Sequence, residues 1–137
     1  MSLGLLLPSG VVLGLARWLT PDPSGVGTHI QLGLEPCGIM SWLNFPCPMC
    51  GMTTTFSLMA HFRPIDAFVN QPFGVVLFIA TVIVFAIAAQ EIAFPRKRWQ
   101  RLWQWTFGRE MYVVSGLLVG MLSAWVYKIA IMGDFLS

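Results

Sequence analysis

Three long runs of apolar residues dominate the pattern of hydrophobic and polar positions. A helix that crosses a bilayer needs about 20 mostly apolar residues, and such runs extend over 3–19, 72–94 and 111–132. The second run is the clearest, because no charged residue occurs from Ala67 to Gln90. Its many β-branched residues would favour a strand in water, but a lone strand in lipid leaves its backbone polar groups unpaired. The pattern therefore predicts three transmembrane helices.

Two shorter segments also have helical periodicity. Residues 48–62 are apolar but number only about 15, which is typical of a re-entrant or interfacial helix rather than a crossing. Residues 96–107 place Trp and Leu on one side and basic residues on the other, which favours a helix lying flat at the headgroups over a plain connecting loop. Residues 20–47 are rich in Gly and Pro and predict a loop. The expected fold is one all-α integral membrane domain over 1–137, with three transmembrane helices, one short re-entrant or interfacial helix and an amphipathic connector.

Composition and charge agree with this architecture and indicate an orientation. Hydrophobic residues make up 56% of the chain and charged residues 10%, whereas an average soluble domain has about 25% charged residues. Five of the eight basic residues lie between Arg96 and Arg109, flanked by apolar runs, which favours a membrane surface over a nucleic-acid partner. By the positive-inside rule the hairpin 95–109 is cytoplasmic and the loop that carries the cysteines is outside. We therefore expect an integral membrane protein in this orientation. A fourth crossing by 48–62 would change this assignment.

Small residues recur on the third apolar run. Gly116, Gly120 and Ala124 are spaced by four, which lets two membrane helices approach closely. We expect this face to pack against a helix of the same chain; a homodimer or another membrane protein is the alternative partner. Glu91 and Lys128 could form a transport pair, but both lie near helix ends, where charge is tolerated.

The stretch 45–54, Phe-Pro-Cys-Pro-Met-Cys-Gly-Met-Thr-Thr, contains the candidate chemistry. Cys47 and Cys50 form a CxxC pair at the expected start of the short helix, with Cys47 at the cap and Pro48 at the first helical position. The N-terminus of a helix stabilises a thiolate. We therefore expect Cys47 to be the more reactive thiol.

Three interpretations of the cysteines stay open. The first is structural: a tight turn held by buried thiols or a static disulfide. The second is a membrane thiol–disulfide oxidoreductase that uses Cys47 and Cys50. The third is a metal site built from Cys37, Cys47 and Cys50 with His29 or His61. The odd count of three cysteines argues against a fully paired disulfide framework. The sequence leaves any cofactor unidentified.

Cys37, the stretch from Pro46 to Thr53 and Asn70-Gln71-Pro72 before an apolar helix together resemble a bacterial membrane family, the domain of unknown function numbered 2752. Its mark is a CPxCGxTR-like stretch, and the resemblance covers roughly residues 34–89. The residues that it singles out are Pro46, Cys47, Pro48, Cys50, Gly51, Thr53, Gln71 and Pro72. Thr54 stands where the family usually has Arg, so no role of that Arg carries over. The resemblance to a bacterial membrane family implies a location in the bacterial inner (plasma) membrane. It implies no activity, and we expect an accessory or structural membrane subunit rather than an enzyme.

Overall fold

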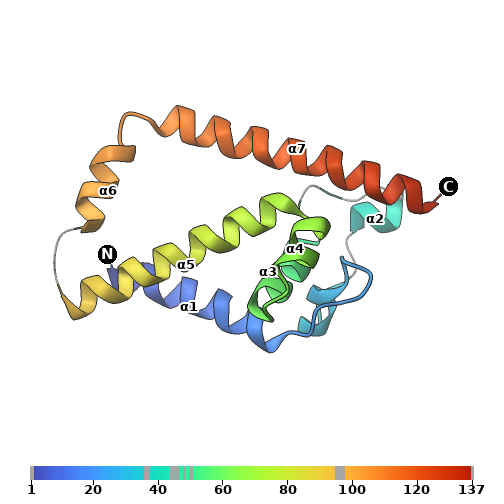
Figure 1. The fold of residues 1–137 in the computed structure, drawn as a ribbon, viewed down its shortest axis with the longest axis horizontal. Coiled ribbons are helices and arrows are strands. Elements are labelled where there is room, and N and C mark those ends of the chain that lie inside the picture. Colours follow the sequence, from blue (N-terminus) through green and yellow to red (C-terminus); the bar gives the residue numbers. More distant parts are fainter. Residues whose placement is uncertain are drawn as a thin grey trace.

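The computed structural model describes residues 2–35, 38–43, 47, 49, 51–94 and 98–136, and the regular elements within them are all helices (Figure 1). In chain order they are α1 (Ser2–Trp18), the 3-10 helix η1 (Thr28–Leu32), α2 (Gly38–Leu43), α3 (Met52–Ala60), α4 (Pro64–Asn70), α5 (Pro72–Ala93), α6 (Arg98–Thr106) and α7 (Glu110–Leu136).

Two of these helices are long and apolar enough to span a membrane. They are α5 and, within α7, the segment Glu110–Ile131, each 22 residues long, or roughly 33 Å at 1.5 Å per residue. The helix α1 is apolar too, but its 17 residues reach only about 26 Å, slightly less than the roughly 30 Å of a hydrocarbon core. The all-helical prediction is confirmed, and two of the three expected spans meet the length criterion.

The helices α1 and α5 pack closely along each other (Figure 1). Several buried residues of these two helices are small: Ala16 and Ser9 of α1 and Ala88 of α5. A Cβ atom added to Gly10 would lie 3.3 Å from the ring of Phe85. Close approach through small side chains is how helices associate in lipid, where apolar burial gives no net advantage.

The elements divide between the two ends of the long helices (Figure 1). One end holds the N-terminus and α6, and the other holds η1, α2, α3, α4 and the C-terminus. The helix α7 touches α5 only sparsely, and every residue from Glu110 to Val119 is exposed. The first half of α7 therefore lies open beside α5.

The interior is unlike that of a soluble protein. Its largest fully buried side chains are all polar: Gln71, Thr28, Thr54, Thr55 and Ser57. The large apolar side chains of α5 and α7 are mostly exposed; Val76 and Val119 are 59% and 62% exposed. In water the reverse is expected. This distribution fits a chain whose outer surface is covered by lipid or by another apolar surface.

The short helix differs from the expected 48–62 at both ends. Gly51 has φ +86°, a left-handed conformation that cannot continue into a helix, so α3 begins at Met52. Phe62 also has positive φ (+59°), and Arg63 precedes a proline, which disfavours helical geometry. The helix α3 therefore ends at Ala60, and a separate helix, α4, follows. The expected loop 20–47 likewise contains two short helices, η1 and α2.

Candidate functional site

A cluster of buried and half-buried polar groups joins four separate parts of the chain at the start of α3. We call it the polar cluster: Gly25, Gly51, Thr55, Asn70 and Lys128. Asn70 is its centre, because its Nδ2 donates to Gly51 O at 3.1 Å and to Thr55 Oγ1 at 2.9 Å. Its Oδ1 accepts a hydrogen bond from Lys128 Nζ at 2.6 Å. One amide side chain thus connects α3, α4 and α7.

Lys128 is the buried charge of this cluster, with 5% of its surface exposed. Its Nζ also donates to Asn70 O at 3.1 Å, and the neighbouring Tyr127 donates from its hydroxyl to Val69 O at 3.1 Å. Both acceptors are carbonyls of the last turn of α4, which have no partner within their own helix. A cation at that position is also favoured by the helix dipole. The helix α7 therefore caps α4.

Two glycines allow the backbone to approach this cluster. Gly25 and Gly51 have φ of +76° and +86°, which glycine adopts readily. A Cβ atom at Gly51 would lie 2.5 Å from Gly25 O and 3.2 Å from Lys128 Nζ, and one at Gly25 would lie 2.5 Å from Asn70 Oδ1. The glycine that follows the cysteine pair is therefore required by both its conformation and its contacts.

Buried hydroxyls fix the loop after α1 to α3. Thr28 Oγ1 and Thr54 Oγ1 are 2.7 Å apart, and Ser57 Oγ donates to Leu19 O at 2.6 Å. Thr54 stands at the position where the family that this sequence resembles usually has Arg, and its hydroxyl contacts the first residue of η1.

The loop after α1 also contains an acidic residue with a shifted pKa. Hydrogen bonds from the side chain and backbone of Ser24 lower the pKa of Asp22.

The structure gives a partial account of the cysteine motif. Cys47 is half-buried and forms no disulfide with any described residue. The N-cap of α3 is Gly51 and not Cys47, so the expectation of a cysteine at the helix cap is wrong, because the left-handed Gly51 delays the helix. Thr53 lies half-buried in the first turn of α3. The remaining motif residues, Cys37, Pro46, Pro48 and Cys50, lie outside the described residues.

The candidate metal ligands are separate in the described part of the chain. His29 belongs to η1, and the Nδ1 atom of His61, which follows α3, lies 2.8 Å from Ser57 O. No group of three potential ligands forms among the residues that the structure describes. Metal binding that involves Cys37 or Cys50 is untested.

The remaining sequence candidates occupy distinct places. Gln71 is buried in the extended link between α4 and α5, and Pro72 is in the first turn of α5. A Cβ atom at Gly120 would lie 3.1 Å from the ring of Phe73 in α5, whereas one at Gly116 would meet nothing within 4 Å. Glu91 lies in the last turn of α5, at the far end from Lys128, so these two residues do not form a pair.

Sequence reasoning did not find the polar cluster as a unit. Asn70 is noted in the sequence only as part of the Asn-Gln-Pro segment of the family resemblance, and Lys128 only as one half of a possible transport pair with Glu91. The two are 58 positions apart, and no local pattern joins them. The signal that could have joined them is a single lysine inside an apolar run, which requires a polar partner.

These observations define the chain as a small helical protein with two helices long and apolar enough to span a membrane and a polar cluster at one end of them. The sequence profile of the family described as Protein of unknown function (DUF2752) matches residues 37–85. The predicted resemblance to that family is therefore confirmed over this segment, which runs from α2 into α5. No curated protein and no solved structure matches the chain.

Proposed function

We propose that this chain is an integral protein of the bacterial inner (plasma) membrane and acts as an accessory or structural subunit of another membrane protein. The observation that carries the proposal is the exposure of its two longest helices. Only 11% of the most apolar 18-residue stretch of α5 is buried inside the chain, and the same share is buried in α7. A core helix of a soluble protein would be mostly buried, and so large an exposed apolar surface needs a bilayer or a partner.

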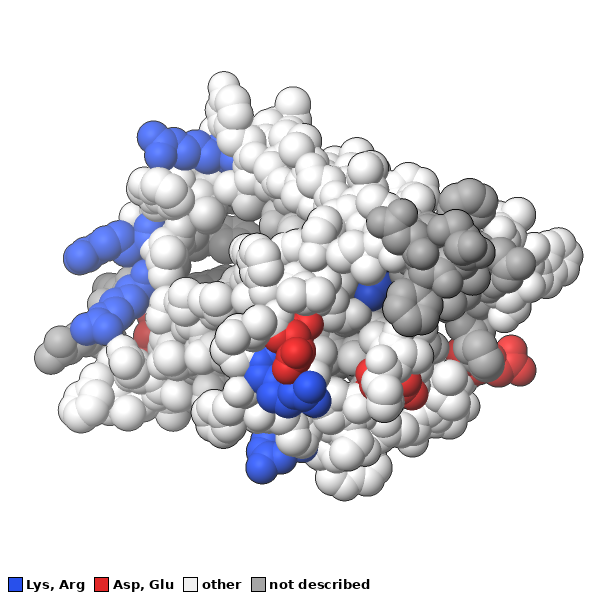
Figure 2. Space-filling model, turned by 45° about the vertical axis from the view of Figure 1, so that its right-hand side comes forward, with Lys and Arg blue, Asp and Glu red and all other residues white. Residues whose placement is uncertain are grey.

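In this proposal α1, α5 and α7 cross the bilayer. The hairpin 95–109 is cytoplasmic, and the polar cluster and cysteines face outside. Basic side chains project from the end of the molecule where α6 lies (Figure 2). The helix α6 itself combines Arg98 and Arg101 with the exposed rings of Trp103 and Trp105. Such a helix suits an anionic headgroup layer.

The orientation can be tested by labelling. A single cysteine replaces Gln100 in a background without native cysteines, and a matched cysteine replaces Ser24 in the opposite loop. A membrane-impermeant maleimide applied to intact cells should label the variant at 24 and leave the variant at 100 unlabelled until the membrane is permeabilised. Labelling of 100 from outside would contradict the orientation.

The subunit role is supported by the open half of α7. Residues 111–119 are exposed and, apart from Ser115, mostly apolar, and a Cβ atom added to Gly116 would meet nothing within 4 Å. Small residues on a free helix face permit close helix contact. A photo-crosslinking residue is placed at Leu117, Val119 or Val126 in three separate variants. The variants whose residue faces the partner should each give one discrete adduct with the same protein. Adducts with lipid alone at all three positions would exclude a subunit that docks through α7.

A second candidate function is thiol–disulfide exchange by Cys47 and Cys50. The observation in its favour is the ammonium of Lys128 beside Gly51, the residue that follows the pair in sequence, because a nearby cation favours a thiolate. In this reaction one thiolate attacks a substrate disulfide and forms a mixed disulfide. The second cysteine then displaces the reduced substrate and leaves the pair oxidised.

Mass spectrometry of the protein purified from membranes separates the interpretations of the cysteines. Exchange predicts that one of Cys47→Ser and Cys50→Ser traps a mixed disulfide with a partner, and that the other is inactive. A metal site predicts that these variants and Cys37→Ser all lose the same ion. A structural role predicts lower stability, with no trapped partner and no ion.

A further inference from the structure

The exposed face of α4 is apolar, which reverses the usual arrangement of a short amphipathic helix. Ile65, Phe68 and Val69 lie within about 100° of one another around this helix and are all exposed, Ile65 by 78%. The other side of α4 points inward: Ala67 is fully buried, and Asn70 belongs to the polar cluster. In a soluble protein the apolar side of such a helix faces the core. The outward face of α4 therefore needs an apolar environment outside the chain.

Phe62, in the turn between α3 and α4, adds another exposed apolar side chain. Its ring is 89% exposed, and its φ is +59°. Phe62 N donates to Met59 O at 3.1 Å and Arg63 N donates to Leu58 O at 2.9 Å, the pattern of a Schellman turn, whose left-handed position is usually glycine. A bulky residue persists in that conformation only where its surroundings compensate for the strain. Because so exposed a ring gains little from packing within the chain, the compensation must come from outside it.

The position of α4 relative to the long helices fixes its depth in the proposed bilayer. Only Gln71 separates α4 from the start of α5, and the seven residues of α4 extend about 10 Å. Its last turn is held to α7 by Tyr127 and Lys128. The headgroup region on each side of the hydrocarbon core is about 5–8 Å thick. The helix α4 therefore lies at the level of the headgroups, at the same end as α2 with its exposed Trp42 (Figure 1).

We infer that the exposed face of α4, together with Phe62, inserts into the interfacial layer of the leaflet opposite α6. The inference rests on the membrane placement proposed above. Lipid suits this face better than a protein partner, because Ile, Phe and Val side chains offer no hydrogen bond, whereas protein interfaces contain about one per 100–200 Å². The face also continues into the exposed apolar surface of α5, where Val76 is exposed.

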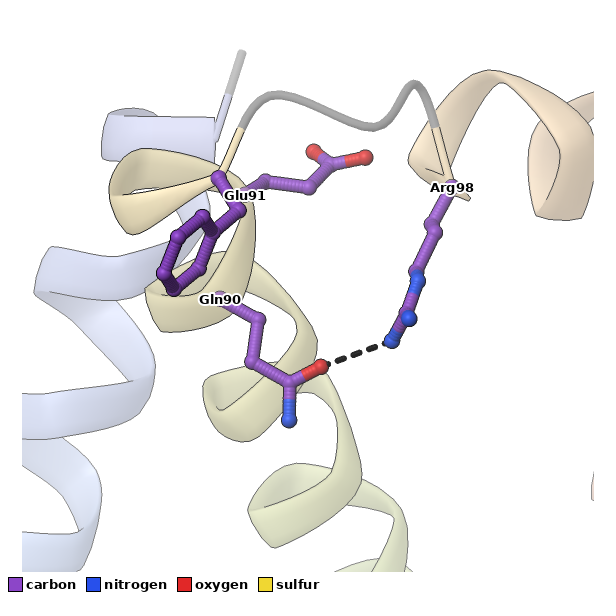
Figure 3. A pocket seen from close by; sticks show the side chains of 4 residues that line it. Gln90, Glu91 and Arg98 are labelled. Atoms are coloured by element: carbon purple, nitrogen blue, oxygen red, sulfur yellow. Dashed lines mark hydrogen bonds between the residues drawn. The ribbon is translucent and has the colours of Figure 1, made fainter.

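The charges beside α4 differ from those at the other end of α5. There a hollow of about 350 Å³ is lined by Gln90, Glu91, Phe94 and Arg98 (Figure 3), and the basic helix α6 begins. Beside α4 the charged side chains are Arg63 and Asp66, which form an ion pair at 2.8 Å and add no net charge. Insertion of α4 should therefore depend on apolar burial and not on salt.

Spin-label accessibility in vesicles of phosphatidylethanolamine and phosphatidylglycerol tests the inference. A single cysteine carries the label at Ile65 or Phe68, in a full chain whose native cysteines are replaced by serine. Molecular oxygen concentrates in lipid, whereas a polar nickel chelate stays in water. The ratio of oxygen to nickel accessibility at both positions should exceed that at Asp66, the matched control on the polar side of α4, by roughly threefold or more, because an interfacial helix buries its apolar face by about 5–10 Å. Molar sodium chloride should leave the ratio unchanged.

Access of both reagents to 65 and 68 would place this face in water, and exclusion of both would place it under protein. Either result overturns the inference. Flotation of the vesicles separates these results from failure of the membrane placement. A chain that floats with a nickel-accessible face loses only this inference, and a chain that does not float loses the proposed function as well.

Two further variants do not depend on removal of the cysteines or on a strained turn. With the native cysteines present, a photo-crosslinking residue at Ile65 should give lipid adducts and one at Asp66 should give few; a discrete protein adduct at 65 would overturn the inference. Phe62→Gly should not lower the melting temperature in detergent, because glycine adopts the left-handed conformation readily. In vesicles it should lower the oxygen-to-nickel ratio of a label at Ile65, and an unchanged ratio would remove Phe62 from the inserted face.

Discussion

The buried contact between Lys128 and Asn70 permits a test in which each partner is removed in turn. Lys128 Nζ donates to both oxygens of Asn70, at 2.6 and 3.1 Å, and is nearly fully buried. Asn70 additionally donates to Gly51 O and Thr55 Oγ1. The two partners are therefore not equivalent: removing the lysine removes a charge, whereas removing the amide leaves that charge buried.

Lys128→Met keeps a long apolar side chain and removes the ammonium. Hydrogen bonds to a charged group contribute about 1.5–3 kcal/mol each, but the burial of the ion, which costs several kcal/mol, is also removed. We expect a net loss of about 1–3 kcal/mol. Asn70→Ala removes the nearer acceptor of a buried cation, a change that costs about 3–5 kcal/mol. The double variant, Lys128→Met with Asn70→Ala, should be no less stable than Asn70→Ala alone, because it contains no buried cation that has lost its acceptor.

Unfolding of the purified protein in detergent, followed by circular dichroism, measures these differences. For a chain of this size, each kcal/mol shifts the melting temperature by roughly 3–6 °C. Tyr127→Phe is the control, since it removes only the adjacent bond to Val69 O and should cost about 0.5–1.5 kcal/mol. Equal losses in the two single variants, or additive losses in the double variant, would refute the view that Asn70 stabilises the buried ammonium.

Four other substitutions test packing and charge. Gly74→Ala should lower stability by about 1–3 kcal/mol, because the new Cβ would lie 2.9 Å from a side-chain carbon of Thr55; Gly116→Ala, in open space, should leave it unchanged or raise it slightly, and equal melting temperatures would contradict this. Gly120→Leu should lower the melting temperature, because its Cβ would lie 3.1 Å from an aromatic ring of α5; no change would mean that this face meets only lipid. Because the pKa of Asp22 is held below its ordinary 3.8, its ionised form stabilises the fold above that pH and the benefit is lost as the pH falls through the lowered pKa. The parent should therefore melt above Asp22→Asn at neutral pH and approach it in acid, and a constant difference would show that the carboxylate charge contributes nothing.

The sequence predicted the long helices well because a long, uncharged apolar run is a strong and local signal. The expected segment 72–94 agrees closely with α5, Pro72–Ala93, where a proline tolerated in the first turn and an uncharged run define both ends. The expected segment 111–132 lies within α7, Glu110–Leu136. In such segments hydropathy and length suffice, because every backbone group must be paired within the helix.

The region between α1 and α5 was less predictable, because its structure depends on contacts between distant residues. Helical periodicity runs through 48–62, but the left-handed Gly51 fits against Gly25 O, and that contact fixes the start of α3. The role of Asn70 depends equally on Lys128, 58 positions later. Periodicity detects a face of a helix and cannot detect a partner that arrives from another part of the chain.

The positions of the charges along α5 and α7 relate the polar cluster to the proposed bilayer. In α7, Glu110 and Lys128 are 18 residues apart, which is roughly 27 Å. In α5, Pro72 and Glu91 are 19 residues apart, or roughly 28 Å. Both distances approach the thickness of a hydrocarbon core, about 30 Å. In the proposed orientation Glu91 and Glu110 lie at the cytoplasmic boundary, which would put the polar cluster at the opposite boundary rather than at the midplane. A buried lysine is tolerated there because the neighbouring backbone is already polar, and α7 is consequently held to α4 by hydrogen bonds at that boundary.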